Sequence, residues 1–118
     1  MQEVLTDINS RDDIKSILIN FYQVAQEDDV ISEKFLDLNM DEHIEVIINF
    51  WDSIIFGTNT YQGDPFGKHI SMGLEEKHFT RWLKLFTDQI DSQYQGKNTD
   101  EMKLRGKTIA QIFQHKLG

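Results

Sequence analysis

The spacing of the apolar residues constrains this fold most, because it follows a helical period in four segments and shows no sustained alternation. In the first segment, Ser10 is placed to cap a helix, and Asp12 and Asp13 put negative charge in its first turn, where it is favourable. The apolar residues then recur every three or four positions, at Ile14, Ile17, Leu18, Phe21, Tyr22 and Ala25. Since no run has a period of two, we predict an all-α fold.

Three further long helices are predicted in the same way. Asn39 is placed to cap a helix that ends near Gly57, and the buried face of this helix carries Ile44, Ile47, Ile48, Trp51, Ile54 and Ile55. A third helix is expected from about Glu75 to Tyr94, with an apolar face of Phe79, Trp82, Leu83, Phe86 and Ile90. Residues 31–38 are expected to form one or two helical turns.

The last helix is expected to follow a turn at the sequence GKNT, residues 96–99. Thr99 and Asp100 are the predicted caps of this helix. Its predicted apolar side consists of Met102, Ile109, Ile112 and Phe113. The sequence therefore predicts one domain over residues 1–118, with residues 1–10 as an N-terminal extension.

Composition excludes several classes of function. The chain has 118 residues and no cysteine, which excludes disulfides and thiolate metal sites. Its net charge of −8 argues against nucleic acid and against an anionic membrane surface as partners. No apolar run is long enough to span a membrane, and the N-terminus lacks the pattern of a secretory signal. We therefore expect a cytoplasmic protein, and a monomer because no large apolar stripe is left exposed.

The segment of residues 58–73 breaks the helical pattern and contains the only proline of the chain, together with His69. A structureless segment of this length is uncommon in a compact domain and tends to be functional. A histidine there is most simply a surface residue. It would also serve as an axial ligand, because the second ring nitrogen can be fixed by a backbone carbonyl.

Three polar aromatic side chains lie on helix faces that are otherwise apolar. Tyr22, His43 and Trp82 each have an ordinary explanation, as a helix-edge tyrosine, a solvated histidine and a core tryptophan. Together they offer a phenol, an imidazole and an indole N–H, which all need partners when they are buried. If they converge, the site is apolar with a few directed donors, and a flat apolar cofactor such as haem fits it best.

Four stretches of the sequence resemble the third group of the truncated haemoglobins. They are FYQVAQED, HIEVIINFWDSIIFGTNTYQGDP, KHISM and HFTRWLKLF, and the resemblance extends from about Asp12 into the last helix. The resemblance implies a shortened globin fold, in which two antiparallel helix pairs cross around the haem. It also implies haem b as cofactor, O₂, NO or CO as ligands, and an electron donor that is not identified.

The resemblance also implies roles for individual residues. His69 matches the histidine that ligates the haem iron, and Tyr22, His43 and Trp82 match the residues around the bound ligand. The iron would then be five-coordinate on His69, or six-coordinate if His43 or water closes the sixth position. Phe35 matches the phenylalanine that packs on the haem, Ile47 lies one turn after His43 and would line the same pocket, and Phe79 is a further expected haem contact. Lys68 is expected as a partner for the propionates from its position alone. His78 is expected to be exposed or near a haem edge, since the matching motif places the ligating histidine before its helix.

The physiological task is left open between NO and O₂ chemistry, peroxide chemistry, and ligand sensing or storage. Two other classes are also open. One is a helical module without cofactor, whose acidic surface binds a basic protein. The other is a non-haem metal protein that uses His69 near Asp64, although the sequence lacks paired Glu-x-x-His motifs.

Overall fold

The computed structural model describes residues 4–35, 39–58 and 73–117, and these ranges contain helices but no strand. The prediction of an all-α fold is therefore confirmed. The elements are α1 (Arg11–Glu27), the short 3₁₀ helix η1 (Ser32–Phe35), α2 (Met40–Phe56), α4 (Glu76–Gln93) and α5 (Lys97–Leu117). Of the predicted turns at 31–38, η1 forms one, and residues 36–38 lie outside the described ranges.

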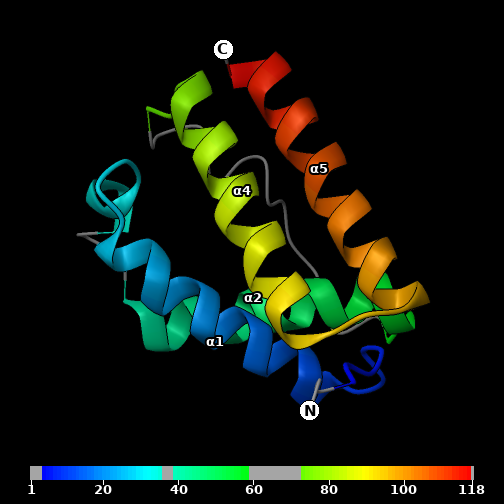
Figure 1. The fold of residues 1–118 in the computed structure, drawn as a ribbon. Helices are drawn as coiled ribbons and strands as arrows, with labels where there is room; N and C mark the ends of the chain where they lie inside the picture. Colours follow the sequence, from blue (N-terminus) through cyan, green and yellow to red (C-terminus); the bar gives the residue numbers. More distant parts are fainter. Residues whose placement is uncertain (1–3, 36–38, 59–72, 118) are drawn as a thin grey trace.

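The long helices form two antiparallel pairs that cross one another (Figure 1). In one pair α4 packs along α5, and in the other α1 packs on α2. Contacts of α1 with α4 and of α2 with α5 join the pairs, while η1 packs against α1. None of the helices in the described part combines the length and the hydropathy that a bilayer-spanning segment needs.

Local sequence explains where α1 and α2 begin and end. The Ser10 hydroxyl accepts the backbone N–H of Asp13 at 3.4 Å, and the Asn39 side chain accepts that of Glu42 at 3.4 Å. α2 ends at Gly57, whose φ of 64° is a left-handed conformation that favours glycine. These three predicted helix ends are confirmed.

The predicted start of the last helix is wrong, because α5 begins at Lys97 rather than at Thr99. The cap comes from the N-terminal segment. The Asp7 carboxylate accepts the backbone N–H groups of Asn98 at 2.9 Å and of Thr99 at 2.8 Å, as well as the Thr99 hydroxyl at 2.8 Å. Burial raises the pKa of Asp7, but these hydrogen bonds outweigh it and leave the pKa lowered. Asp7 therefore ties the N-terminal segment to α5, and the next residue, Ile8, is fully buried.

One residue of the predicted apolar side of α5 is also misplaced. Met102 is fully buried and Ile109 packs against the core, but Ile112 is 46% exposed. At 100° per residue, Ile112 lies about 80° around the helix from Met102, whereas Ile109 lies within about 20° of it. Ile112 is therefore off the stripe that faces the other helices.

The core is centred on Phe86 of α4. Its ring stacks on Trp82 at 4.7 Å and on Trp51 of α2 at 5.2 Å, and it meets Phe21 of α1 edge-on at 5.5 Å. A Cβ atom at Gly106 of α5 would lie 2.5 Å from the Phe86 ring, so only glycine allows this close approach. One aromatic side chain thus joins both helix pairs, and it fixes the position of Trp82.

Candidate functional site

Three of the predicted site residues come together from three different elements. The ring of Tyr22 in α1 meets Phe35 of η1 edge-on, with 5.7 Å between the ring centroids. It also meets His43 of α2, with 6.3 Å between the centroids and an interplanar angle of 79°. The site side chains of α1, η1 and α2 therefore face one another. We call Tyr22, Phe35, His43 and Trp82 the distal cluster.

Trp82 joins this cluster because its indole lies close enough to the Tyr22 phenol to affect the pKa of that phenol. The indole has only an N–H to donate, so the phenol oxygen is the atom that it stabilises. Burial raises the pKa of Tyr22 far above its usual value, and the Trp82 N–H only partly opposes that rise. The phenol is therefore protonated at any physiological pH, and its own hydrogen is available to a further acceptor.

Apolar side chains surround the donors of the distal cluster. Ile47 lies one turn after His43 on α2, and Ile44 follows His43 directly; both are partly buried and pack against the core. Trp82 is held by its stack on Phe86. The arrangement combines apolar walls with a few directed polar groups, which is the usual character of a site for a small ligand or cofactor.

His78 is buried, so the expectation that it is exposed is wrong. Its side chain is 2% exposed, and its Nδ1 accepts the backbone N–H of Glu75 at 2.8 Å. Two contacts account for this: the imidazole satisfies one of the backbone N–H groups that the first turn of a helix leaves unpaired, and η1 packs over the ring with Glu33 beside Nε2. Whether His78 lies near a haem edge stays a prediction.

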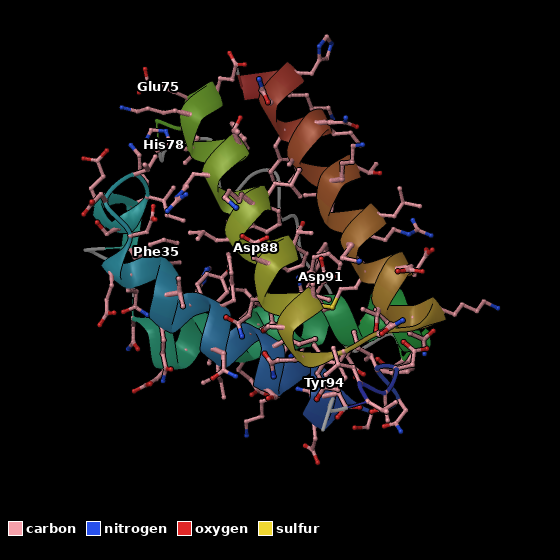
Figure 2. All side chains as sticks on the ribbon, in the orientation of Figure 1. Phe35, Glu75, His78, Asp88, Asp91 and Tyr94 are labelled. Carbon is pink, nitrogen blue, oxygen red and sulfur yellow. The ribbon has the colours of Figure 1, made fainter. Side chains whose placement is uncertain are left out.

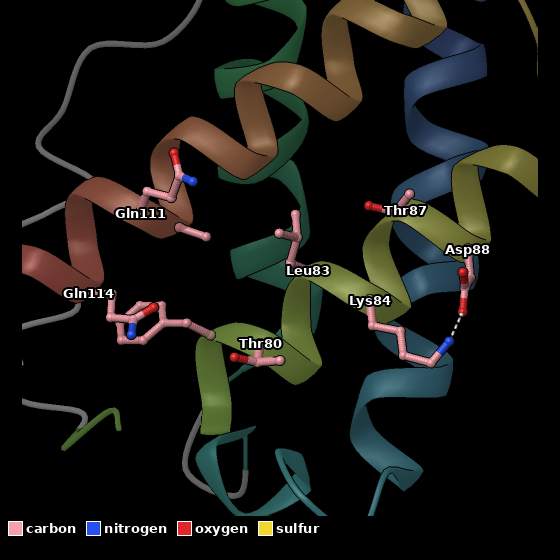
Figure 3. A pocket seen from close by; sticks show the side chains of 9 residues that line it. Thr80, Leu83, Lys84, Thr87, Asp88, Gln111 and Gln114 are labelled. Carbon is pink, nitrogen blue, oxygen red and sulfur yellow. Dashed lines mark hydrogen bonds and ion pairs between the residues drawn. The ribbon is translucent and has the colours of Figure 1, made fainter. Parts of the chain in front are cut away.

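Phe79 is also buried, and it lines a groove of about 370 Å³ between α4 and α5 (Figure 3). Leu83 and Ala110 contribute further apolar surface to this groove. Lys84, on its rim, donates to Asp88 at 2.8 Å. The contact between Phe79 and haem that the resemblance implies stays a prediction.

Two further predicted site residues, His69 and Lys68, lie outside the described ranges, as does Asp64 of the non-haem alternative. Within the described ranges, no group of three or more His, Asp and Glu side chains is placed to hold a metal ion. The side chains that the structure brings together are thus those predicted for the ligand side of a haem.

Comparison with known proteins agrees with this geometry. The sequence model of the bacterial-like globins matches residues 4–115. This chain belongs to that globin family. The group 3 truncated haemoglobin of Campylobacter jejuni is 27% identical over 115 residues, which cover 92% of this chain and 91% of that protein. The predicted resemblance to the third group of truncated haemoglobins is confirmed.

The fold also matches a solved structure. The crystal structure of the group III truncated haemoglobin from Campylobacter jejuni superposes with a TM-score of 0.87. The match covers 98% of this chain and 96% of that chain, at 24% sequence identity. The truncated globin fold is therefore confirmed. Membership of the globin family supports haem-based binding of small ligands in general.

Sequence reasoning identified the distal cluster and missed the residues that hold its elements in place. The Asp28 carboxylate, at the end of α1, forms an ion pair with Arg81 of α4 at 2.7 Å. Arg81 directly precedes Trp82 in α4. Glu33 and Lys34 of η1 contact the region where α4 begins. The one available signal was the density of charged residues at 27–34. A solvated surface would show the same density of charged residues.

Proposed function

We propose that this globin binds haem b through His69 and holds a diatomic ligand such as O₂, NO or CO against the distal cluster. The observation that supports this most directly is that Tyr22, Phe35 and His43 meet from three different elements, with the Trp82 indole close to the Tyr22 phenol. Iron in the haem supplies the position at which the ligand binds. Lys68, Ile47 and Phe79 are the further proposed haem contacts.

The chain's own residues would stabilise a ligand that carries partial negative charge. In this arrangement the Trp82 N–H would donate to the Tyr22 oxygen and leave the Tyr22 hydrogen to be directed at the ligand. A donor that itself accepts a hydrogen bond is polarised by it, which strengthens its own hydrogen bond. A bound haem would cover the partly buried side chains of the cluster, and hydrogen bonds to a charged acceptor are stronger where water is excluded.

The same donors could assist NO and O₂ chemistry or peroxide chemistry. Each of these reactions needs electrons from a donor outside this chain, whereas ligand storage or sensing does not. His43 would then have one of two roles. It either contacts the ligand beside Tyr22 or closes the sixth position itself.

Replacing the proposed iron ligand tests the proposal. We expect His69→Ala to abolish tight haem retention, because the haem would then lose its bond to the protein through iron and keep only its weaker contacts. The measurement is the visible spectrum of purified protein with added haem, before and after reduction and carbon monoxide. His115→Ala is the matched control, because His115 is an exposed histidine near the end of α5.

Wild type and the control should show a sharp Soret band that shifts with carbon monoxide, and His69→Ala should not. Unchanged haem content in His69→Ala would refute the ligand assignment. A wild-type protein that takes up haem only loosely would refute the proposed cofactor.

A further inference from the structure

His78 lies where α4 and η1, two elements of the distal cluster, meet, and the proposed function does not use it. It is on α4 four residues before Trp82, hence on the same face of the helix. Opposite it is Glu33 of η1, two residues before Phe35. Figure 2 shows His78, Glu75 and Phe35 at the same end of the molecule.

The hydrogen bond at one ring nitrogen determines what the other nitrogen can do. Nδ1 of His78 accepts the Glu75 backbone N–H at 2.8 Å, so it carries no proton. The neutral ring then has its hydrogen on Nε2, which makes this atom a donor. Nε2 is buried and makes no hydrogen bond within the described residues. The carboxylate of Glu33 is nearby, with Oε1 at 3.6 Å.

This tautomer also argues against a metal at His78. A metal ligand would need an unprotonated Nε2, and a neutral imidazole cannot leave both nitrogens unprotonated. The charged group in contact with the ring is the Glu33 carboxylate of η1, while Lys34 of η1 contacts the Gly73 carbonyl and Glu75 meets the ring through its backbone N–H. The Glu33 carboxylate is the acceptor that fits a directed N–H donor.

A second contact joins the same two segments. Lys34 Nζ of η1 donates to the Gly73 carbonyl, two residues before the N-cap of α4, at 3.2 Å. Glu33 and Lys34 are adjacent in η1, so both contacts act on the turn that carries Phe35. The spacing between Phe35 and Trp82, on two sides of the distal cluster, therefore depends on these two contacts between η1 and the start of α4.

We infer that His78 is a positioning residue for the distal cluster. It holds the start of α4 through the hydrogen bond at Nδ1, and it holds η1 through the contact between Nε2 and Glu33. The inference deepens the proposed function, because it concerns the pocket into which Tyr22 and Trp82 would direct their donors. His78 does not itself touch the ligand. It determines the positions of Trp82 and Phe35 relative to Tyr22.

Two amide substitutions separate the two nitrogens. Asn places an acceptor near the position of Nδ1, and Gln places a donor near the position of Nε2. His78→Asn therefore keeps the α4 cap and loses the Glu33 contact, and His78→Gln does the reverse. Glu33→Ala removes the same contact from the other side, and Glu33 is 63% exposed, so this variant keeps the core intact. Glu76→Ala, at an exposed carboxylate of the same turn, is the control.

The readout is the indole N–H resonance of Trp82 in the ferrous carbon monoxide form, which is diamagnetic. The chain has only two tryptophans, so Trp82→Phe assigns the signal. We expect His78→Asn and Glu33→Ala to move this resonance in the same direction. Combining them should move it no further than either alone, because both remove one contact. Glu76→Ala should leave it in place.

A Trp82 resonance that stays in place in both His78→Asn and Glu33→Ala would overturn the inference. So would shifts of the two variants that simply add. If His78→Asn does not fold, Glu33→Ala still decides the question. If the wild-type chain takes up no haem, the proposed function fails separately. The same resonance is then measured in the haem-free protein, with the same expected shifts.

Discussion

At the scale of single residues, ligand retention depends most directly on the Tyr22 phenol. We expect Tyr22→Phe to speed O₂ dissociation, because it removes the donor while it keeps the ring contacts with Phe35 and His43. A hydrogen bond to a charged acceptor contributes about 1.5–3 kcal/mol, which corresponds to an increase of about ten- to a hundredfold in the off-rate. The measurement is stopped-flow displacement of O₂ by carbon monoxide.

Tyr94→Phe is the matched control for this prediction. It removes the same hydroxyl from a tyrosine that donates to Asp13 at 3.0 Å, a pair that joins the C-cap of α4 to the first turn of α1. Its O₂ off-rate should equal that of the wild type. Equal off-rates for Tyr22→Phe and wild type would show that Tyr22 does not donate a hydrogen bond to the bound ligand.

Helical spacing placed Tyr22, His43 and Trp82 on faces that are otherwise apolar, but their assignment to one site, with Phe35, came from the resemblance to the truncated haemoglobins. The sequence could not predict that His78 is buried. A histidine in the first turn of a helix is normally solvated, and here its burial depends on η1, which comes from a different part of the chain. The tautomer of His78 likewise follows from a backbone N–H that only the folded turn places beside it.

At the scale of elements, the ion pair between Asp28 and Arg81 joins the end of α1 to α4. Arg81 donates to Oδ1 of Asp28 at 2.8 Å from Nε and at 2.7 Å from Nη2. The other carboxylate oxygen accepts the backbone N–H of Val30 at 3.0 Å and of Ile31 at 3.2 Å. One buried carboxylate therefore fixes both the turn after α1 and the segment of α4 that carries Trp82.

We expect Asp28→Asn to lower the free energy of unfolding by about 1–3 kcal/mol at neutral pH. Larger losses occur when a fully buried pair is broken, but the Arg81 side chain is 37% exposed and solvent screens its charge. The measurement is urea unfolding followed by circular dichroism. Asp88→Asn is the control: its partner Lys84 is exposed, so the expected loss is about 0.5 kcal/mol or less.

The pH dependence of that loss follows from the pKa of Asp28. Hydrogen bonds from Arg81 lower this pKa below the usual value of 3.8, and they outweigh the opposing effect of burial. A carboxylate with a lowered pKa stabilises the folded chain above its unfolded pKa, and the stabilisation is lost as the pH falls through the folded value. The difference between wild type and Asp28→Asn should therefore be constant down to about pH 4 and shrink below it. A difference that is unchanged at pH 2 would contradict the assignment.

The start and end of each helix were predictable only where the cap is local. Ser10, Asn39 and Gly57 are adjacent to the helices that they cap, and all three predictions are confirmed. The acceptor that caps α5 is Asp7, 92 residues before Thr99, and no local pattern connects the two. Gly106 is a similar case, because its need for a small side chain comes from Phe86 on another helix.

At the scale of the whole molecule, the distal cluster draws on both helix pairs, with Tyr22 and His43 from one pair and Trp82 from the other. A group that binds among these side chains contacts both pairs in the folded state and neither in the unfolded chain. Such a ligand stabilises the fold by mass action. We therefore expect haem to raise the melting temperature of the haem-free protein.

The stabilisation at a free haem concentration of 100 times Kd is about 2.7 kcal/mol. For a domain of this size that corresponds to a rise of about 10 °C in Tm. The measurement is thermal unfolding followed by circular dichroism, with and without haem. We expect His115→Ala to behave as the wild type and His69→Ala to lose most of the rise. Haem that changes the visible spectrum but leaves the Tm of the wild type unmoved would indicate non-specific binding to folded and unfolded chain alike, because a group that binds only between the folded helix pairs must raise the Tm.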